Sequence, residues 1–288
     1  MEKLCDLHVH SHYSDGTCSP AQLIELAKHA KLSAIALCDH NTVDGLPDLL
    51  AAAEGSGIEA VPGIEFSTDY EDTELHILGL FIRPEHYDAI NALMDDVKRR
   101  KEQSNIDLVA QLRAAGYGID YETIRASTPT GFVNRAMVGA ELTRKGYTES
   151  IQDAFRRLLS PKHGYYTPPK RPDAYETISF IKRLGAVAVL AHPFLNLDEA
   201  GLRRFLPRAV ELGLDGMEVL YPKYSPEETA LACEIAKEFS ILPSGGSDFH
   251  GENKPDIQIG IGRGNLRIPL QYLQDLVLRA LLPFTPAK

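Results

Sequence analysis

Alternate histidines open the chain, in the stretch CDLHVHSHYSDG at residues 5 to 16. Alternate side chains of an extended segment point to the same face, which places His8, His10 and His12 on one side of a strand. Asp15 follows just beyond them. A core strand normally carries valine or leucine at such positions. Imidazoles and a carboxylate gathered in this way indicate metal binding, provided that the chain supplies further ligands.

Further histidines and carboxylates fall at or beside other predicted strands. The segments CDH, PGIE, ELHIL, LAHP and GGSDFH supply His40, Glu65, His76, His192, Asp248 and His250. Any one of these residues alone would usually be satisfied by a hydrogen bond or an ion pair. Together with His8, His10 and Asp15 they form a set whose joint burial would be costly without a cation. We therefore expect a metal site made by these nine residues.

The predicted ligands are nitrogen and oxygen donors, without a cysteine thiolate. Such a set suits manganese, iron or zinc. Nine ligands are too many for one ion, so we expect two or three divalent transition metals that share a bridging carboxylate.

Short apolar runs alternate with amphipathic stretches, which is typical of βα units. We expect strands at 3–10, 33–40, 58–67, 74–82, 186–193, 216–221 and 241–250, and helices at 19–31, 45–55, 173–184, 198–212 and 226–239. In parallel α/β barrels the loops after the strands converge on one mouth. The nine residues are expected to meet there.

The middle of the chain lacks strand-like runs. Helices alone are expected between residues 84 and 172, at 86–115, 132–145 and 150–159. We interpret residues 1–83 and 173–288 as one α/β barrel domain and residues 84–172 as an all-α insertion, which is expected to act as a lid or substrate domain.

Composition narrows the range of partners. The chain has 288 residues, a formal net charge of −10 and four cysteines without CxxC spacing. An acidic chain is not expected to grip long nucleic acid by bulk electrostatics, although a small phosphorylated substrate needs only local cations. No apolar run approaches the roughly 20 residues needed to span a bilayer. No signal peptide is visible after Met1, and a cytoplasmic location without membrane partners is expected.

The blocks DLHVHSHYSDG, CDHNTVDG, PGIEFS, LHILG, LAHP and GSDFHG resemble the PHP (polymerase and histidinol phosphatase) family of metal-dependent phosphoesterases. The resemblance implies a distorted (β/α)7 barrel with a trinuclear site. It implies a first metal held by His8, His10, Glu65 and Asp248, a second held by Glu65, His76 and His192, and a third held by Asp15, His40 and His250.

The blocks NRAMVGAELTRKGY at 134–147 and FRRLLSPKHGYYTPP at 155–169 are similar to the insert of stand-alone PHP enzymes such as bacterial 3',5'-nucleotide bisphosphate phosphatases. That similarity implies that Arg135, Lys162 and Tyr165 bind substrate. Members of this group usually have Arg-x-His in the first block, whereas Met137 stands here in place of the histidine.

The expected chemistry is attack on phosphorus by a metal-bridging hydroxide, because bound cations lower the pKa of water. No catalytic side chain is assigned beyond that hydroxide, and His12 and His163 are candidates to protonate the leaving group. The expected substrate is a small nucleotide-like phosphate, foremost the 3'-phosphate of a nucleoside 3',5'-bisphosphate, with phosphate as product.

Several alternatives stay open. A less polar pocket beside Met137 would favour a phosphodiesterase acting on cyclic phosphates. Histidinol phosphate phosphatase, exonuclease action on short RNA, amide hydrolysis and a non-catalytic metal-binding module are further alternatives. A basic lane could offset the negative charge for short RNA; it comprises Arg99, Arg100, Lys101, Arg156, Arg157, Lys170 and Arg171.

Overall fold

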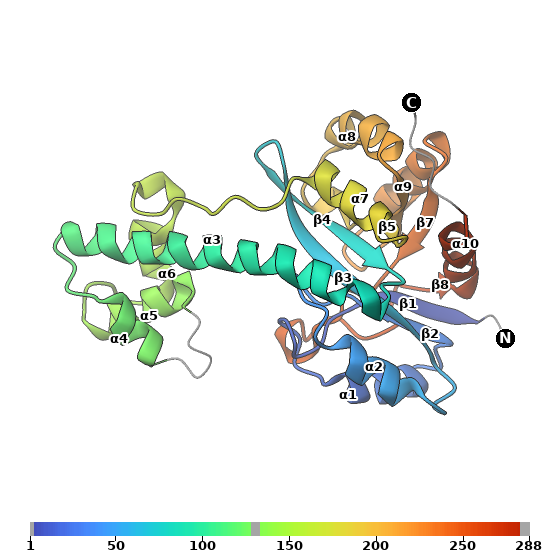
Figure 1. The fold of residues 1–288 in the computed structure, drawn as a ribbon, viewed down its shortest axis with the longest axis horizontal. Coiled ribbons are helices and arrows are strands. Elements are labelled where there is room, and N and C mark those ends of the chain that lie inside the picture. Colours follow the sequence, from blue (N-terminus) through green and yellow to red (C-terminus); the bar gives the residue numbers. More distant parts are fainter. Residues whose placement is uncertain (1–2, 128–132, 283–288) are drawn as a thin grey trace. The chain divides into compact units, whose positions relative to one another are not determined.

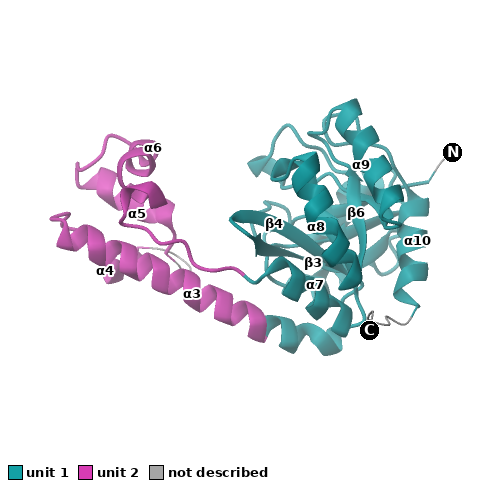
Figure 2. Cartoon of the chain, turned by 90° about the horizontal axis from the view of Figure 1, so that it is seen from above, with its two compact units in different colours: residues 1–91, 172–288 teal, residues 92–171 magenta. Residues whose placement is uncertain are grey.

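The computed structural model describes residues 3–127 and 133–282. Its chain forms two compact units, residues 1–91 with 172–288 and residues 92–171 (Figure 2). The boundary between them falls within a long helix, a few residues after the boundary expected at residue 84. The role of the second unit in substrate binding stays a prediction.

A mixed sheet forms the core of the first unit (Figure 1). Its strand order is β7-β6-β5-β4-β3-β2-β1-β8. Past β7 the chain returns to β1, where Val9 and Phe249 form a parallel bridge. This contact curls the sheet into a nearly closed barrel of eight strands, so the α/β barrel predicted from the sequence is confirmed, with one strand more than expected. The strands are β1 (Leu4–Val9), β2 (Ala34–Leu37), β3 (Glu59–Tyr70), β4 (Thr73–Leu80), β5 (Val187–Ala191), β6 (Leu214–Leu220), β7 (Leu242–Gly245) and β8 (Ile268–Pro269).

Strand β4 runs antiparallel to both of its neighbours, β3 and β5. It therefore begins at the edge of the sheet where β3 and β5 end. His76, in β4, pairs with Ser67 of β3 and Ala191 of β5. This residue reaches the mouth of the barrel from the first half of its strand, and not from its carboxyl end as in a parallel barrel. The reversal was not predicted from the sequence.

Helices of the first unit follow the strands as expected. They are α1 (Pro20–His29), α2 (Leu46–Ala53), α7 (Ala174–Arg183), α8 (Glu199–Glu211), α9 (Pro226–Glu238) and α10 (Leu270–Ala280). The side chain of Ser19 caps α1, with Pro20 in the first turn. Helix α10 and the short strand β8 were not predicted.

Small side chains fill the barrel interior. Cys5 and Cys38 are fully buried among alanine, valine and leucine side chains of β2, β4 and β5. Burial raises the pKa of the Cys5 thiol to about 12, so this thiol is neutral. Both cysteines therefore serve as small apolar core residues.

The described part of the second unit contains helices and no strand. They are α3 (Tyr87–Ala114), which starts in the first unit, α4 (Tyr121–Ala126), α5 (Arg135–Arg144) and α6 (Ile151–Ala154), followed by a π-helical turn (Phe155–Leu159). Residue 132, the expected start of the helix at α5, lies outside the described residues. Helix α4 was not predicted. An apolar core of its own, including Leu112, Val138 and Leu142, holds this unit together.

A search of the described helices found none with the length and apolar character required to cross a membrane.

Candidate metal centre

The elements of the barrel bring all nine predicted ligands into one network of contacts. Residues of β1 and the loop after it supply His8, His10 and Asp15, and the loop after β2 supplies His40. Strands β3 and β4 supply Glu65 and His76. The loops after β5 and β7 supply His192, Asp248 and His250.

Glu65 lies at the centre of this network and is fully buried. Its Oε1 lies 2.7 Å from Nδ1 of His76 and 3.0 Å from Nε2 of His192. Its Oε2 lies 3.2 Å from Nε2 of both His8 and His10, and 3.0 Å from Nδ1 of His40. The two oxygens of one carboxylate therefore face two different sets of imidazoles.

Several buried atoms of this network have no hydrogen-bond partner. Within the described residues, these include Oε2 of Glu65 and the Nδ1 atoms of His10 and His40. Three imidazoles surround Oε2 of Glu65 at hydrogen-bond distance, yet none makes a hydrogen bond with it. Unsatisfied buried polar atoms are costly and rare. Nitrogen and oxygen donors in this arrangement fit divalent transition metals.

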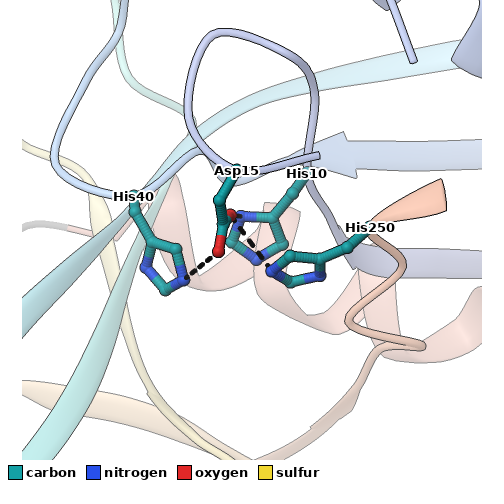
Figure 3. A group of neighbouring side chains, drawn as sticks. All are labelled: His10, Asp15, His40 and His250. Atoms are coloured by element: carbon teal, nitrogen blue, oxygen red, sulfur yellow. Dashed lines mark ion pairs between the residues drawn. The ribbon is translucent and has the colours of Figure 1, made fainter. Parts of the chain in front are cut away.

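Figure 3 shows one group of four residues of the cluster, which includes the exposed side chain of Asp15. His10, Asp15, His40 and His250 each offer a donor atom, and these atoms all lie within 4.8 Å of one another. Nε2 of His250 lies 3.1 Å from Oδ1 of Asp15. The Asp15 side chain is 56% exposed, whereas those of His10 and His250 are buried. Solvent and substrate can therefore approach the cluster beside Asp15.

The structure brings together groups of side chains that could each hold a metal ion. These groups share members with the three predicted ligand sets but are not identical to them. Asp15, His40 and His250 stay together, and His10 joins them. His40 and His76 also form a group with Glu65. His192 meets Glu65 as predicted and also belongs to a group with His8 and Glu218.

Charges inside the cluster shift the pKa values of its members. Burial opposes ionisation of Glu65, but the surrounding histidines outweigh it and hold the pKa of this carboxyl well below its usual value. Burial likewise opposes protonation of His76, and the charge of Glu65 outweighs it and raises the pKa of His76 to about 10. Glu65 also raises the pKa of His8 and His40 against the effect of burial. Metal ions would thus compete with protons for these imidazoles.

Glu218, in β6, belongs to the cluster, although the sequence analysis did not name it. Its fully buried carboxylate lies 3.0 Å from Nδ1 of His8, and it accepts a hydrogen bond of 2.7 Å from the backbone amide of His192. A carboxylate behind a metal-binding imidazole fixes the ring and its tautomer. The available signal was a single acid within the apolar strand sequence GMEVLY.

Asp39 organises the loop that carries Asp15. Its carboxylate accepts hydrogen bonds from the amide and the hydroxyl of Ser11, at 2.8 and 2.6 Å, and from the hydroxyl of Ser14 at 2.6 Å. Gly16 lets this loop approach β1 closely, because a Cβ there would lie 2.5 Å from the carbonyl oxygen of His10.

Two residues of the cluster have unusual backbone conformations. Asp248 has a φ of +54° and His192 a φ of +27°, which is uncommon for residues other than glycine. Such conformations gather at functional sites, where the surrounding structure maintains them. Oδ2 of Asp248 accepts hydrogen bonds from the Tyr221 hydroxyl at 2.8 Å and from the Lys254 ammonium at 2.7 Å. The sequence analysis named neither partner.

The three predicted substrate residues lie in the second unit. The guanidinium of Arg135 lies over the ring of Tyr166, 4.2 Å from its centroid, and donates to the Leu159 carbonyl oxygen at 3.4 Å. Lys162 is exposed in a short 3-10 turn, and Tyr165 is partly exposed. Substrate contact by these residues stays a prediction.

The two candidates for proton transfer lie in different units. His12 is exposed, and its Nδ1 lies 3.3 Å from the carbonyl oxygen of Cys18. His163 lies in the second unit, and its Nε2 is a buried atom without a hydrogen-bond partner. A role of either residue in protonating the leaving group stays a prediction.

Several known proteins with similar sequences are named for the hydrolysis of phosphate esters. The chain is 32% identical to a 5'-3' exoribonuclease of Haemophilus influenzae, over 87% of this chain and 91% of the relative. It is 33% identical to a phosphoribosyl 1,2-cyclic phosphate 1,2-diphosphodiesterase of Eggerthella lenta, over 86% and 94%. It is 27% identical to a 3',5'-nucleoside bisphosphate phosphatase of Chromobacterium violaceum, over 88% and 90%.

The fold and a family model agree with these relatives. A metal-dependent phosphoesterase structure from Bifidobacterium adolescentis matches with a TM-score of 0.73 and 27% identity, covering 96% of each chain. The model of the PHP domain matches residues 6–160. The chain therefore belongs to the PHP domain family and is a metal-dependent phosphoesterase.

Proposed function

We propose that the nine clustered residues hold two or three divalent transition metals. This proposal rests on the position of Glu65. Its two carboxylate oxygens face different sets of imidazoles, and Oε2 is buried without a hydrogen-bond partner. His8, His10 and Asp248 would hold one ion with Glu65, and His76 and His192 would hold a second with it. Asp15, His40 and His250 would hold a third, with His10 close by.

Such ions would supply a water of lowered pKa and positive charge for the phosphoryl oxygens. The chain keeps the ligands in place for this chemistry. Glu218 fixes the ring of His8 so that its Nε2 points into the cluster, and Asp39 holds the loop that ends in Asp15. Asp15 leaves the cluster open to an entering phosphate ester, because its side chain is largely exposed.

The preferred substrate in this proposal is a nucleoside 3',5'-bisphosphate, with hydrolysis of the 3'-phosphate and release of inorganic phosphate. Support comes from the relative named a 3',5'-nucleoside bisphosphate phosphatase. Further support comes from Arg135, whose guanidinium is held over Tyr166 and beside Phe155. A guanidinium held in this way is suited to bidentate contact with the second phosphate.

Two other substrates have specific support. The relative named an exoribonuclease, at 32% identity, favours the first phosphodiester of a short RNA. The relative named a cyclic phosphate diphosphodiesterase, at 33% identity, favours a cyclic phosphate. Met137 agrees with the cyclic phosphate, because it packs against the apolar core of the second unit and offers no polar contact to another phosphate.

The test is product release by the manganese-loaded protein from a panel of substrates. The panel contains adenosine 3',5'-bisphosphate, nucleoside monophosphates, a 5'-phosphorylated RNA oligomer, cyclic phosphates and histidinol phosphate. Asp248→Asn serves as the control, and we expect it to lower the rate at least about 100-fold because an anionic predicted ligand of the first metal is lost. Fastest phosphate release from the bisphosphate supports the proposal. Turnover of the oligomer or the cyclic substrates alone would contradict it and assign the enzyme to the phosphodiesterases.

A further inference from the structure

Lys254 brings a permanent positive charge to the metal cluster from within the barrel unit. Its ammonium nitrogen lies 2.7 Å from Oδ2 of Asp248. The residues predicted to bind substrate, Arg135, Lys162 and Tyr165, all lie in the other unit. Lys254 is therefore a cation that the barrel unit itself places at the cluster.

The backbone around Lys254 is attached to the loop that carries Asp15. The amide of Glu252 donates to Oγ1 of Thr17 at 3.0 Å, and the side-chain amide of Asn253 donates to the carbonyl oxygen of Asp15 at 2.7 Å. These contacts join two segments that each carry predicted metal ligands. The position of Lys254 is therefore fixed relative to the cluster.

Gly251 makes this attachment possible. Its φ is +65°, and a Cβ at this position would lie 2.1 Å from Oγ1 of Thr17. A residue with a side chain would thus be strained and would also push the two segments apart. The close approach of Gly251 to Thr17 therefore requires glycine at this position, and it holds the backbone beside Lys254 in place.

The carboxylate of Asp248 separates Lys254 from the histidines. Its Oδ1 faces inward, 3.3 Å from Nε2 of His10 and 3.5 Å from Nδ1 of His250. Its Oδ2 faces outward and accepts from Tyr221 and Lys254. The ammonium of Lys254 therefore contacts one oxygen of Asp248, while the other oxygen of this carboxylate faces the histidines of the cluster.

The side chain of Lys254 is partly exposed to solvent, although its partner Asp248 is buried. The side chain of Lys254 is 31% exposed, whereas that of Asp248 is 6% exposed. In the described part of the chain, Asp248 is the only acceptor seen for the ammonium, which has three N–H bonds. Tyr221 already satisfies the same oxygen of Asp248. Because the side chain of Lys254 is 31% exposed, its ammonium can contact both Asp248 and an anion that enters from solvent.

We infer that Lys254 is a substrate-binding residue, whose ammonium contacts a non-bridging oxygen of the phosphoryl group at the metal cluster. This inference rests on the proposed phosphoesterase site and adds a cation that the sequence comparison did not suggest. Lysine binds phosphate as a point charge with rotatable donors, so one N–H bond can stay on Asp248 while another reaches the phosphate.

The test measures binding of inorganic phosphate to the manganese-loaded protein by calorimetry, in the wild type and in Lys254→Met, Lys254→Arg and Lys28→Met. Lys28 is a matched control because it also forms an ion pair of 2.7 Å, with Glu25 on the surface of α1. The dissociation constant of manganese is measured for each variant. Release of phosphate from adenosine 3',5'-bisphosphate gives KM and kcat.

We expect Lys254→Met to weaken phosphate binding by about 10- to 100-fold, the effect of losing a hydrogen bond to a charged group. Lys254→Arg should restore a large part of the affinity, and Lys28→Met should match the wild type. Manganese affinity should change by less than about threefold. This pattern supports the inference even if the bisphosphate is not a substrate, in which case the substrate proposal alone fails.

Two results would overturn the inference while leaving the proposed function in place. One is unchanged phosphate affinity in Lys254→Met together with wild-type hydrolysis. The other is a large loss of manganese affinity with unchanged phosphate affinity, which would make Lys254 a positioning residue for Asp248. Absence of phosphate binding to the loaded wild type would also overturn it.

Discussion

At the scale of single residues, Glu65 joins the two sides of the cluster because each of its oxygens meets different histidines. The nine predicted ligands could be found in the sequence because most of them interrupt or directly follow an apolar strand run. Glu218 and Lys254 could not be found in this way. A single acid within a strand looks like an outward-facing residue, and a loop lysine has no periodicity that marks it. Only the structure shows that both contact the cluster.

Glu218→Gln tests whether the carboxylate behind His8 strengthens metal binding by the cluster. The substitution keeps the size of the side chain and removes the charge behind Nδ1 of His8. We expect the dissociation constant of manganese to rise by about 10- to 100-fold, the usual effect of losing such a partner. Titration with manganese followed by calorimetry measures this, with Glu234→Gln on the exposed part of α9 as control. Equal affinities in the two variants would show that Glu218 does not support the metal.

At the scale of elements, hydrophobic periodicity located seven strands and most helices, but not the direction of β4. The sequence of β4 is equally apolar read in either direction, so its composition does not indicate which way the strand runs. The length of the connection before it does indicate the direction. Strands β3 and β4 are separated by only Glu71 and Asp72, and a parallel crossover needs about a dozen residues or more. The short connection therefore dictates a hairpin, which brings His76 to the mouth of the barrel.

The closure of the barrel between β7 and β1 depends on a close backbone approach at Gly246. A Cβ at this position would lie 2.1 Å from Cβ of His8, so Gly246→Ala must move one of the two strands. We expect a loss of about 3 kcal/mol or more in the free energy of unfolding, measured by urea denaturation. Gly79→Ala in β4 is the control, because its Cβ would meet its nearest neighbour at 3.3 Å. Similar stability of the two variants would contradict this account of closure.

At the scale of the whole molecule, the barrel is expected to carry the chemistry and the second unit to select the substrate. Relatives of 27 to 33% identity are named for three different phosphate substrates although they match nearly the whole chain. The ligand pattern therefore predicts phosphoester hydrolysis and leaves the choice of substrate to residues outside the ligand set. We expect local cations such as Lys254 to influence phosphate binding more than the net charge of −10, because distant exposed charges are screened by salt.

Protons and metal ions should stabilise the whole molecule in opposite pH ranges. The pKa of His76 is raised from 6.5 to about 10 in the folded metal-free chain, so its ion pair with Glu65 stabilises the fold fully below pH 6.5. This stabilisation is lost as the pH rises toward 10, where the imidazole becomes neutral in both states. A metal ion needs the neutral imidazole, so its stabilising effect grows over the same range. We therefore expect the difference in Tm between the zinc-loaded and the metal-free protein to increase from pH 6 to pH 8.5 in scanning calorimetry. His76→Gln should flatten this increase, and a difference in Tm that does not depend on pH would contradict the competition between protons and metal.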